Sequence, residues 1–187
     1  MSKTRCLQLK KEILNGRMLS MDPTSGTKNS EAGWAIFDAG KLESSGIISI
    51  ADGAKDERLR DILATLQTEF TEVYDVLALE DIPVARRRGN FDVSQTLIQA
   101  CGVYIAGTSG KLVELNSHTW QAIARRLGGW VKGDESDAQY IGLAAIAFAS
   151  GYTQKLTEKR KIEFLGNLAK ENDYWDLPDM REHWRSE

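Results

Sequence analysis

The sequence predicts a single α/β domain in which helices pack on a mixed β-sheet. Three observations lead to this prediction. First, 187 residues of ordinary composition, 42% hydrophobic and 27% charged, suffice for one well-buried domain and are few for two. Second, short apolar runs typical of strands alternate with longer segments of helical periodicity. Third, the run VLALE at 76–80 is continuously apolar up to its final acid, as in a parallel strand that is covered on both faces.

The predicted elements begin with three strands that run back and forth. A strand over about 18–22 contains MLSM, and AGWAIF and LESSGIISI form a hairpin joined by the turn-rich DAGK. Apolar residues at 59, 62, 63, 66 and 70 recur with helical spacing, so a helix is expected next. VLALE is then the fourth strand.

The second half continues the alternation of helices and strands. A helix is expected over about 92–107, KLVELN at 111–116 is the fifth strand, and SHTWQAIARRL is a helix capped by Ser117. After the glycine-rich GGWVKG, the segment DESDAQYIGLAAIAFASG forms a helix that ends near Gly151. This order predicts a mixed sheet with helices packed on it. The buried stripe of the helix over 92–107 is expected to consist of Val93, Leu97, Ile98, Cys101 and Ile105.

The two ends of the chain differ from its middle. We expect a basic N-terminal extension over 1–17, the main domain over 18–153, and a helical appendage and tail over 154–187. No apolar run approaches the roughly 18 residues that span a membrane, and the N-terminus lacks the apolar core of a secretory signal, so a cytoplasmic protein is expected. Cys6 and Cys101 show no CxxC spacing, which argues against a zinc site or a disulfide framework.

Basic residues gather locally, although the formal net charge is −3. A nucleic-acid surface would therefore have to be local. Each basic cluster alone is more typical of a solvated face than of a binding site, so its position in the fold must decide. The two clusters in the middle of the chain are ARRRGN, with Arg86, Arg87 and Arg88, and ARRLGGWVKG, with Arg125, Arg126 and Lys132 beside Trp130.

Acidic residues stand at three places where predicted elements end or begin. Asp22 ends the first strand, Glu80 ends the fourth, and Asp134 and Asp137 open the last core helix. If the first and fourth strands are parallel neighbours, Asp22 and Glu80 leave the same edge of the sheet. Asp134 and Asp137 are three residues apart and share one face of their helix. The four carboxylates converge if that helix starts at the same edge.

Converging carboxylates predict a metal site. They repel one another unless a cation lies among them, and hard oxygen ligands favour Mg²⁺ or Mn²⁺ over zinc. Two such ions about 4 Å apart can activate water and stabilise the leaving oxygen of a phosphodiester. The expected chemistry is that of a metal-dependent nuclease.

Each acid also has a structural interpretation. Asp22 before PTSG is a common way to open a turn, Asp134 and Asp137 can cap their helix and complement its dipole, and Glu80 can face solvent at a strand end. Asp81 could replace Glu80, and a one-residue shift at the helix start would exchange Asp134 for Glu135. The joint arrangement favours the metal site.

Four segments resemble, in order, the signature regions of RuvC-type Holliday junction resolvases, whose fold is that of ribonuclease H. They are LSMDPTSGTKNSEAGWAIF, LALEDIPVARRRGNFDVSQTLIQACGVYIAG, SHTWQAIARR and DESDAQYIGLAAIAFA. The resemblance spans about 19–150 and implies a mixed five-stranded sheet with helices on both faces. It also implies that Asp22, Glu80, Asp134 and Asp137 are catalytic ligands of two Mg²⁺ ions, for which Mn²⁺ can substitute.

The resemblance further implies the substrate and the assembly. The expected activity is paired hydrolysis of four-way DNA junctions by a homodimer, in the nucleoid or in the cytoplasm of a phage-infected cell. Arg86, Arg87 and Arg88 would hold backbone phosphates, Phe91 could stack on exposed bases or pack at a helix start, and Lys132 could neutralise phosphate charge. The arginine-rich loop, Trp130 and the extra sequence at both ends depart from the family pattern. The chain therefore looks like a divergent member, of a kind that a phage could encode.

Other functions remain open at this point. A flap or general branched-DNA nuclease, or a ribonuclease H acting on RNA–DNA hybrids, would use the same acids. An ATP-binding protein of the actin and sugar-kinase type also uses a strand, an Asp and a small-residue turn, but it needs two copies of the fold, and this chain has no repeat. A catalytically silent DNA-binding module is disfavoured because unpaired acids repel DNA.

Overall fold

The computed structural model describes residues 3–24, 31–81, 91–127, 130 and 132–172. From residue 17 onward, helices and strands follow one another in the order expected from the sequence, whereas a helix within the basic extension over 1–17 was not predicted. They are α1 (Lys3–Asn15), β1 (Arg17–Asp22), β2 (Glu31–Asp38), β3 (Lys41–Ser49), α2 (Lys55–Glu69), β4 (Val76–Asp81), α3 (Phe91–Gly107), β5 (Lys111–Asn116), α4 (Ser117–Leu127), α5 (Asp134–Ser150) and α6 (Glu158–Glu171).

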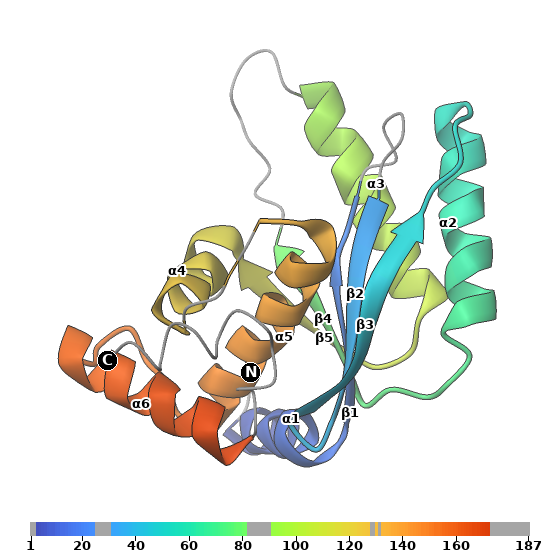
Figure 1. The fold of residues 1–187 in the computed structure, drawn as a ribbon. Coiled ribbons are helices and arrows are strands. Elements are labelled where there is room, and N and C mark those ends of the chain that lie inside the picture. Colours follow the sequence, from blue (N-terminus) through green and yellow to red (C-terminus); the bar gives the residue numbers. More distant parts are fainter. Residues whose placement is uncertain (1–2, 25–30, 82–90, 128–129, 131, 173–187) are drawn as a thin grey trace.

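The five strands form one mixed sheet in the order β3-β2-β1-β4-β5. The hairpin strands β2 and β3 are antiparallel to each other, and β1 is antiparallel to β2. The pairs β1–β4 and β4–β5 are parallel. Figure 1 shows helices on both sides of this sheet. The predicted α/β class and the mixed five-stranded sheet are therefore confirmed.

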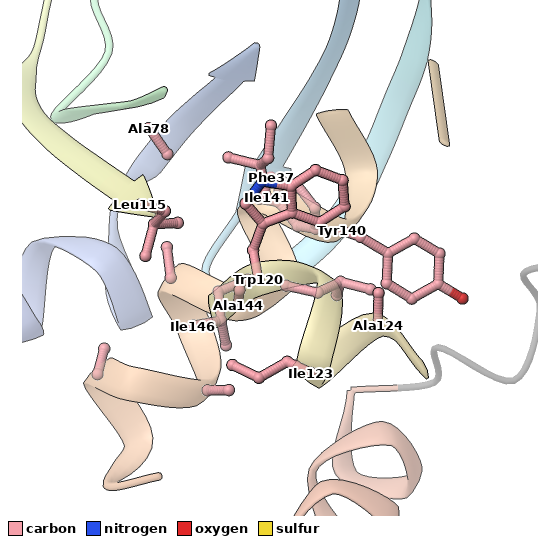
Figure 2. Packing of buried hydrophobic residues seen from close by; sticks show 14 of the residues in the cluster. Phe37, Ala78, Leu115, Trp120, Ile123, Ala124, Tyr140, Ile141, Ala144 and Ile146 are labelled. Atoms are coloured by element: carbon pink, nitrogen blue, oxygen red, sulfur yellow. The ribbon is translucent and has the colours of Figure 1, made fainter. Parts of the chain in front are cut away.

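The central strand β1 divides the core into two layers. Leu19 and Met21 belong to the cluster that β1 forms with α2 and α3, whereas Met18 belongs to the cluster on the opposite face, with α4 and α5. This alternation follows from the two-residue period of a strand. Figure 2 shows the second layer, where Trp120 and Ile123 of α4 pack beside Ile141 of α5 and Phe37 of β2.

Helix α5 lies close to the sheet because small residues face it. A Cβ added at Gly142 would stand 2.2 Å from a ring carbon of Phe37 and 2.8 Å from Ser20 Oγ. The buried Ser20 hydroxyl donates a hydrogen bond of 2.8 Å to the Ala138 carbonyl oxygen, which satisfies a polar group inside the core. These contacts fix the first half of α5 over β1.

Helix α3 buries a different face from the one that the sequence suggested. Ala100 and Tyr104 are fully buried, whereas Ile98 and Ile105 of the predicted stripe are 45% and 42% exposed. The prediction was wrong for Ile98 and Ile105 because α3 carries apolar residues on more than one side, so periodicity did not select a face. Cys101 is half-buried, and the side chains of Val93 and Leu97 lie outside the described residues. The exposed face borders a groove of about 230 Å³ lined by residues of β4, α3 and β5.

The two end helices pack on the α4–α5 layer. Ile13 of α1 is buried and joins the core cluster of that layer. On α6, Glu158 accepts hydrogen bonds from Arg126 of α4 at 2.8 and 3.0 Å, and from Lys161 at 2.7 Å. Leu165 of α6 is also part of the core. Among the described residues, no helix is long and apolar enough to cross a membrane.

Candidate active site

Asp22 and Glu80 lie side by side at one edge of the sheet. In the parallel pairing of β1 with β4, Met21 stands opposite Leu79, so the next residue of each strand reaches the same edge. Both strands are buried up to these acids, and the positions of the two carboxylates are therefore set by the sheet. The two side chains share a hydrogen bond.

Helix α5 begins at the same edge. Asp22 pairs across the sheet with Gly33 of β2, and a Cβ at Gly33 would lie only 1.6 Å from the carbonyl oxygen of Asp134. The N-cap of α5 is Gly133, and no side chain caps the helix. The acids of its first turn are thus not capping groups, and the structure brings Asp134 and Asp137 to the edge that holds Asp22 and Glu80.

The charge state of Asp22 reflects this crowding. Its pKa is raised from the usual 3.8 to about 8, first by burial and then by the charges of Glu80, Asp137 and Asp134. Burial also raises the pKa of Glu80 and of Asp137, and the charges of neighbouring carboxylates add to both shifts. Without a cation, the ionised cluster is therefore strongly disfavoured.

Glu80 has a second neighbour that corrects the sequence analysis. The predicted capping role of Ser117 was wrong, because the amide N–H of His118 donates a hydrogen bond of 3.1 Å to Asn116 Oδ1 instead. The Ser117 hydroxyl hydrogen-bonds to Glu80 and lowers the pKa of that carboxyl against the effect of burial. Ser117 is thus a site neighbour that sequence reasoning placed at a helix start.

Asp137 is held from the connection between α4 and α5. The indole Nε1 of Trp130 donates a hydrogen bond of 2.6 Å to Asp137 Oδ1. This bond, the backbone of Gly133 and the charge of Lys132 each act to lower the pKa of Asp137. Sequence reasoning noticed Trp130 only as an unusual residue, since an aromatic ring in a glycine-rich connection does not indicate its partner.

Asp134 and Glu135 point to different neighbours. The charge of Asp134 acts on both Asp22 and Asp137. Glu135 Oε1 instead accepts a hydrogen bond of 2.6 Å from Ser45 of β3. These two adjacent acids thus have different neighbours: Asp134 belongs to the carboxylate cluster, and Glu135 bonds to the β2–β3 hairpin.

The chemistry of the four carboxylates fits hard divalent cations such as Mg²⁺ or Mn²⁺. Among the residues that the structure describes, no three His, Cys, Asp or Glu side chains are arranged as a ready-made metal site. Glu80 and Asp137 are instead bonded to protein donors. Their charges nevertheless raise the pKa of Asp22, so a cation at this edge would relieve repulsion that the fold itself creates.

The predicted DNA contacts are only partly described. Lys132 is exposed, and its charge acts on Asp137. Phe91 is the first residue of α3, but its side chain lies outside the described part, as do Arg86, Arg87 and Arg88. These four residues follow β4, which ends at the edge that carries Glu80.

Comparison with solved structures identifies the fold. The chain superposes on RuvC of Thermus thermophilus in complex with a Holliday junction substrate with a TM-score of 0.54 and 16% sequence identity. The match covers 72% of this chain and 96% of that chain. The chain has a RuvC-like fold. A further Thermus thermophilus RuvC structure matches with a TM-score of 0.53, 15% identity and the same coverage. No protein-family model and no curated protein sequence matches the chain.

Proposed function

We propose that the chain is a metal-dependent DNA endonuclease that resolves four-way junctions. The observation that supports this most is the half-buried Asp22 carboxylate, whose pKa of about 8 arises at a sheet edge shared with three more carboxylates. Groups with strongly shifted pKa values, gathered by separate elements, mark candidate functional sites. A RuvC-like sheet carries this cluster.

Asp22, Glu80, Asp134 and Asp137 are the residues that we assign to the metal. Two Mg²⁺ ions, for which Mn²⁺ can substitute, would supply an activated water and stabilisation of the leaving oxygen. The rigid ends of β1 and β4 hold Asp22 and Glu80, and the Ser117 and Trp130 bonds orient Glu80 and Asp137. We assign to Lys132 the role of neutralising negative charge on the reacting phosphate.

DNA binding is assigned to residues that follow β4. Arg86, Arg87 and Arg88 would contact backbone phosphates on either side of the reacting bond. Phe91 would stack on bases exposed at a branch point. The position of this segment directly after Glu80 in the sequence supports the assignment.

Four-way junctions are proposed because one structural neighbour is described in complex with a Holliday junction substrate. Resolution requires two symmetric cuts, and this chain carries one carboxylate cluster. A C2 homodimer would provide two equivalent sites. A flap nuclease or a hybrid-cleaving ribonuclease H would use the same cluster on a different substrate.

The decisive experiment incubates the purified protein and Mg²⁺ with four-way, flap, duplex and RNA–DNA hybrid substrates. Paired cuts in the four-way junction are expected. Asp22→Asn should bind the junction as well as wild type or better, because a negative charge is removed, but should not cut it. Near-normal turnover by this variant would overturn the metal assignment, and preferred cleavage of flaps or hybrids would replace the proposed substrate.

A further inference from the structure

Trp130 connects a basic side chain of α4 to the carboxylate cluster. Its Nε1 donates to Asp137 Oδ1 at 2.6 Å, and the guanidinium carbon of Arg125 lies 5.6 Å from the centre of its ring. The ring also packs edge-on against the buried Trp120, with centroids 5.7 Å apart and planes at 87°. The indole is therefore held from three sides.

The indole bond has a consequence for Asp137. A short bond to a carboxylate is stronger than one between neutral groups, and it fixes one of the two carboxylate oxygens. The Asp137 side chain is only partly buried, and its other neighbour at the helix start is the backbone of Gly133, the N-cap of α5, which itself makes no side-chain bond. Trp130 and the Gly133 backbone thus together limit rotation of this carboxylate, and Trp130 fixes its Oδ1.

The ring face has a consequence for Arg125. This side chain is exposed, and it makes a long contact of 3.5 Å with Gln121 of its own helix. A guanidinium stacked on an aromatic ring keeps its in-plane N–H groups free for other acceptors. These N–H groups match the oxygens of a phosphate in a bidentate geometry.

We propose that Trp130 is a positioning residue that orients Asp137 for a cation with its N–H and holds Arg125 with its ring face as a DNA phosphate contact beside the cluster. This inference rests on the proposed nuclease function. It adds to that function a phosphate contact on α4, separate from the arginine segment after β4. It also gives the glycine-rich connection a direct role in arranging the site.

Two substitutions separate the two roles. Trp130→Phe removes the N–H donor and keeps a ring for Arg125 and Trp120, and Arg125→Ala removes the guanidinium and keeps the indole bond. Trp34→Phe on β2, whose ring packs against Phe70, is the matched tryptophan control. Arg160→Ala on α6, an exposed position, is the matched arginine control.

Each variant is measured in three ways. Calorimetric titration gives Mn²⁺ affinity in the absence of DNA, binding of a four-way junction in metal-free buffer at several salt concentrations gives the salt slope, and thermal unfolding gives the midpoint. Trp130→Phe should weaken Mn²⁺ binding about 10-fold, as expected for a residue that orients a ligand, with the salt slope unchanged. Arg125→Ala should make the slope shallower by about 0.9, with Mn²⁺ affinity unchanged.

Other results would overturn the inference. If Trp130→Phe binds Mn²⁺ with the same affinity as Trp34→Phe and unfolds at the same midpoint, Trp130 does not orient Asp137. If Arg125→Ala shows the same salt slope as Arg160→Ala, Arg125 does not contact a DNA phosphate. Both of these failures leave the proposed function intact if Asp22→Asn still abolishes Mn²⁺ binding. Wild-type protein that binds no Mn²⁺ would overturn the proposed function and this inference together.

Discussion

Gly33 of β2 touches the backbone of Asp134, so closely that a Cβ at Gly33 would stand 1.6 Å from the Asp134 carbonyl oxygen and 2.2 Å from its carbonyl carbon. Gly33 also pairs with Asp22 across the sheet. One residue without a side chain therefore lets the start of α5 approach the end of β1. The spacing of the carboxylates depends on this contact.

Gly33→Ala should destabilise the protein and disturb the site. Because the atoms that the new methyl group meets belong to the backbone, the first turn of α5 must move, at a cost of about 1–3 kcal/mol or more. Urea unfolding measures this loss, and Mn²⁺ titration measures the change at the cluster. Gly102→Ala on α3 is the control, since its Cβ would meet nothing within 4 Å, and it should leave stability equal or raise it by up to about 1 kcal/mol.

Stability without metal should fall as pH rises. The folded-state pKa of Asp22 is about 8, against an ordinary 3.8, so between these values the folded chain holds a proton that the unfolded chain has lost. Its favourable contribution is complete at low pH and is lost as pH rises through about 8, with a slope of about 1.4 kcal/mol per pH unit. Glu80 and Asp137 shift in the same direction.

The measurement compares unfolding of wild type and Asp22→Asn between about pH 5 and 8.5. The difference in stability should shift in favour of the variant as pH rises, because an amide does not ionise. Mn²⁺ should stabilise wild type more at pH 8 than at pH 6, since its ligands must be deprotonated. Parallel pH profiles for the two proteins would contradict a half-buried carboxylate crowded by other acids.

Asp134 and Glu135 should differ when each is changed to its amide. Asp134→Asn removes a charge that acts on Asp22 and Asp137, so it should weaken Mn²⁺ binding and cleavage. Glu135→Gln retains an oxygen that can accept from Ser45, so it should keep both. The reverse ranking in a Mn²⁺ titration would assign Glu135 to the metal.

The arginine segment after β4 should contribute to DNA affinity through charge. A triple alanine variant at Arg86, Arg87 and Arg88 should bind junctions more weakly. The dependence of log affinity on log salt should become shallower by up to about 0.9 for each lost contact. An unchanged slope in a salt series would indicate that these arginines lie on a solvated face and do not contact DNA.

The exposed face of α3 is the candidate surface for a homodimer. Tyr104 of this helix is buried within the single chain, whereas Ile98 and Ile105 are exposed. Changing both to Ser should shift light scattering from dimer to monomer. It should also convert paired cuts of a cruciform plasmid into single nicks. Ile162→Ser on α6, also 42% exposed, is the control, and wild-type protein that is strictly monomeric and only nicks would defeat the resolvase proposal.

The ends of two strands could be predicted from the sequence, because continuous apolar runs indicate buried strands. Asp22 and Glu80 are the last residues of two such runs. Adjacent parallel strands then bring these acids together with no further information. The buried face of α3 could not be predicted, since the helix itself carries apolar residues on more than one side. Ala100 and Tyr104 are buried because they pack in the cluster that α3 forms with α2 and the sheet.

The partners around the cluster also escaped prediction. A serine after a strand and before a helix suggests a cap, and only the position of Asn116 beside His118 N–H shows that Ser117 is released for Glu80. The bond from Trp130 depends on where this residue stands relative to α5 in the folded chain. Such orientations are set by tertiary packing, and a local pattern does not contain them.

The parallel pairing of β1 with β4 has a consequence for the time at which activity can arise. The acids of the cluster are contributed by segments far apart in the chain, and such long-range contacts form late in folding. A nascent chain that has left the ribosome only through α4 carries Asp22 and Glu80, but it lacks α5 and the acids of its first turn. The carboxylate cluster is therefore complete only when the last core helix has docked, and the proposed nuclease would gain its cutting activity at that step.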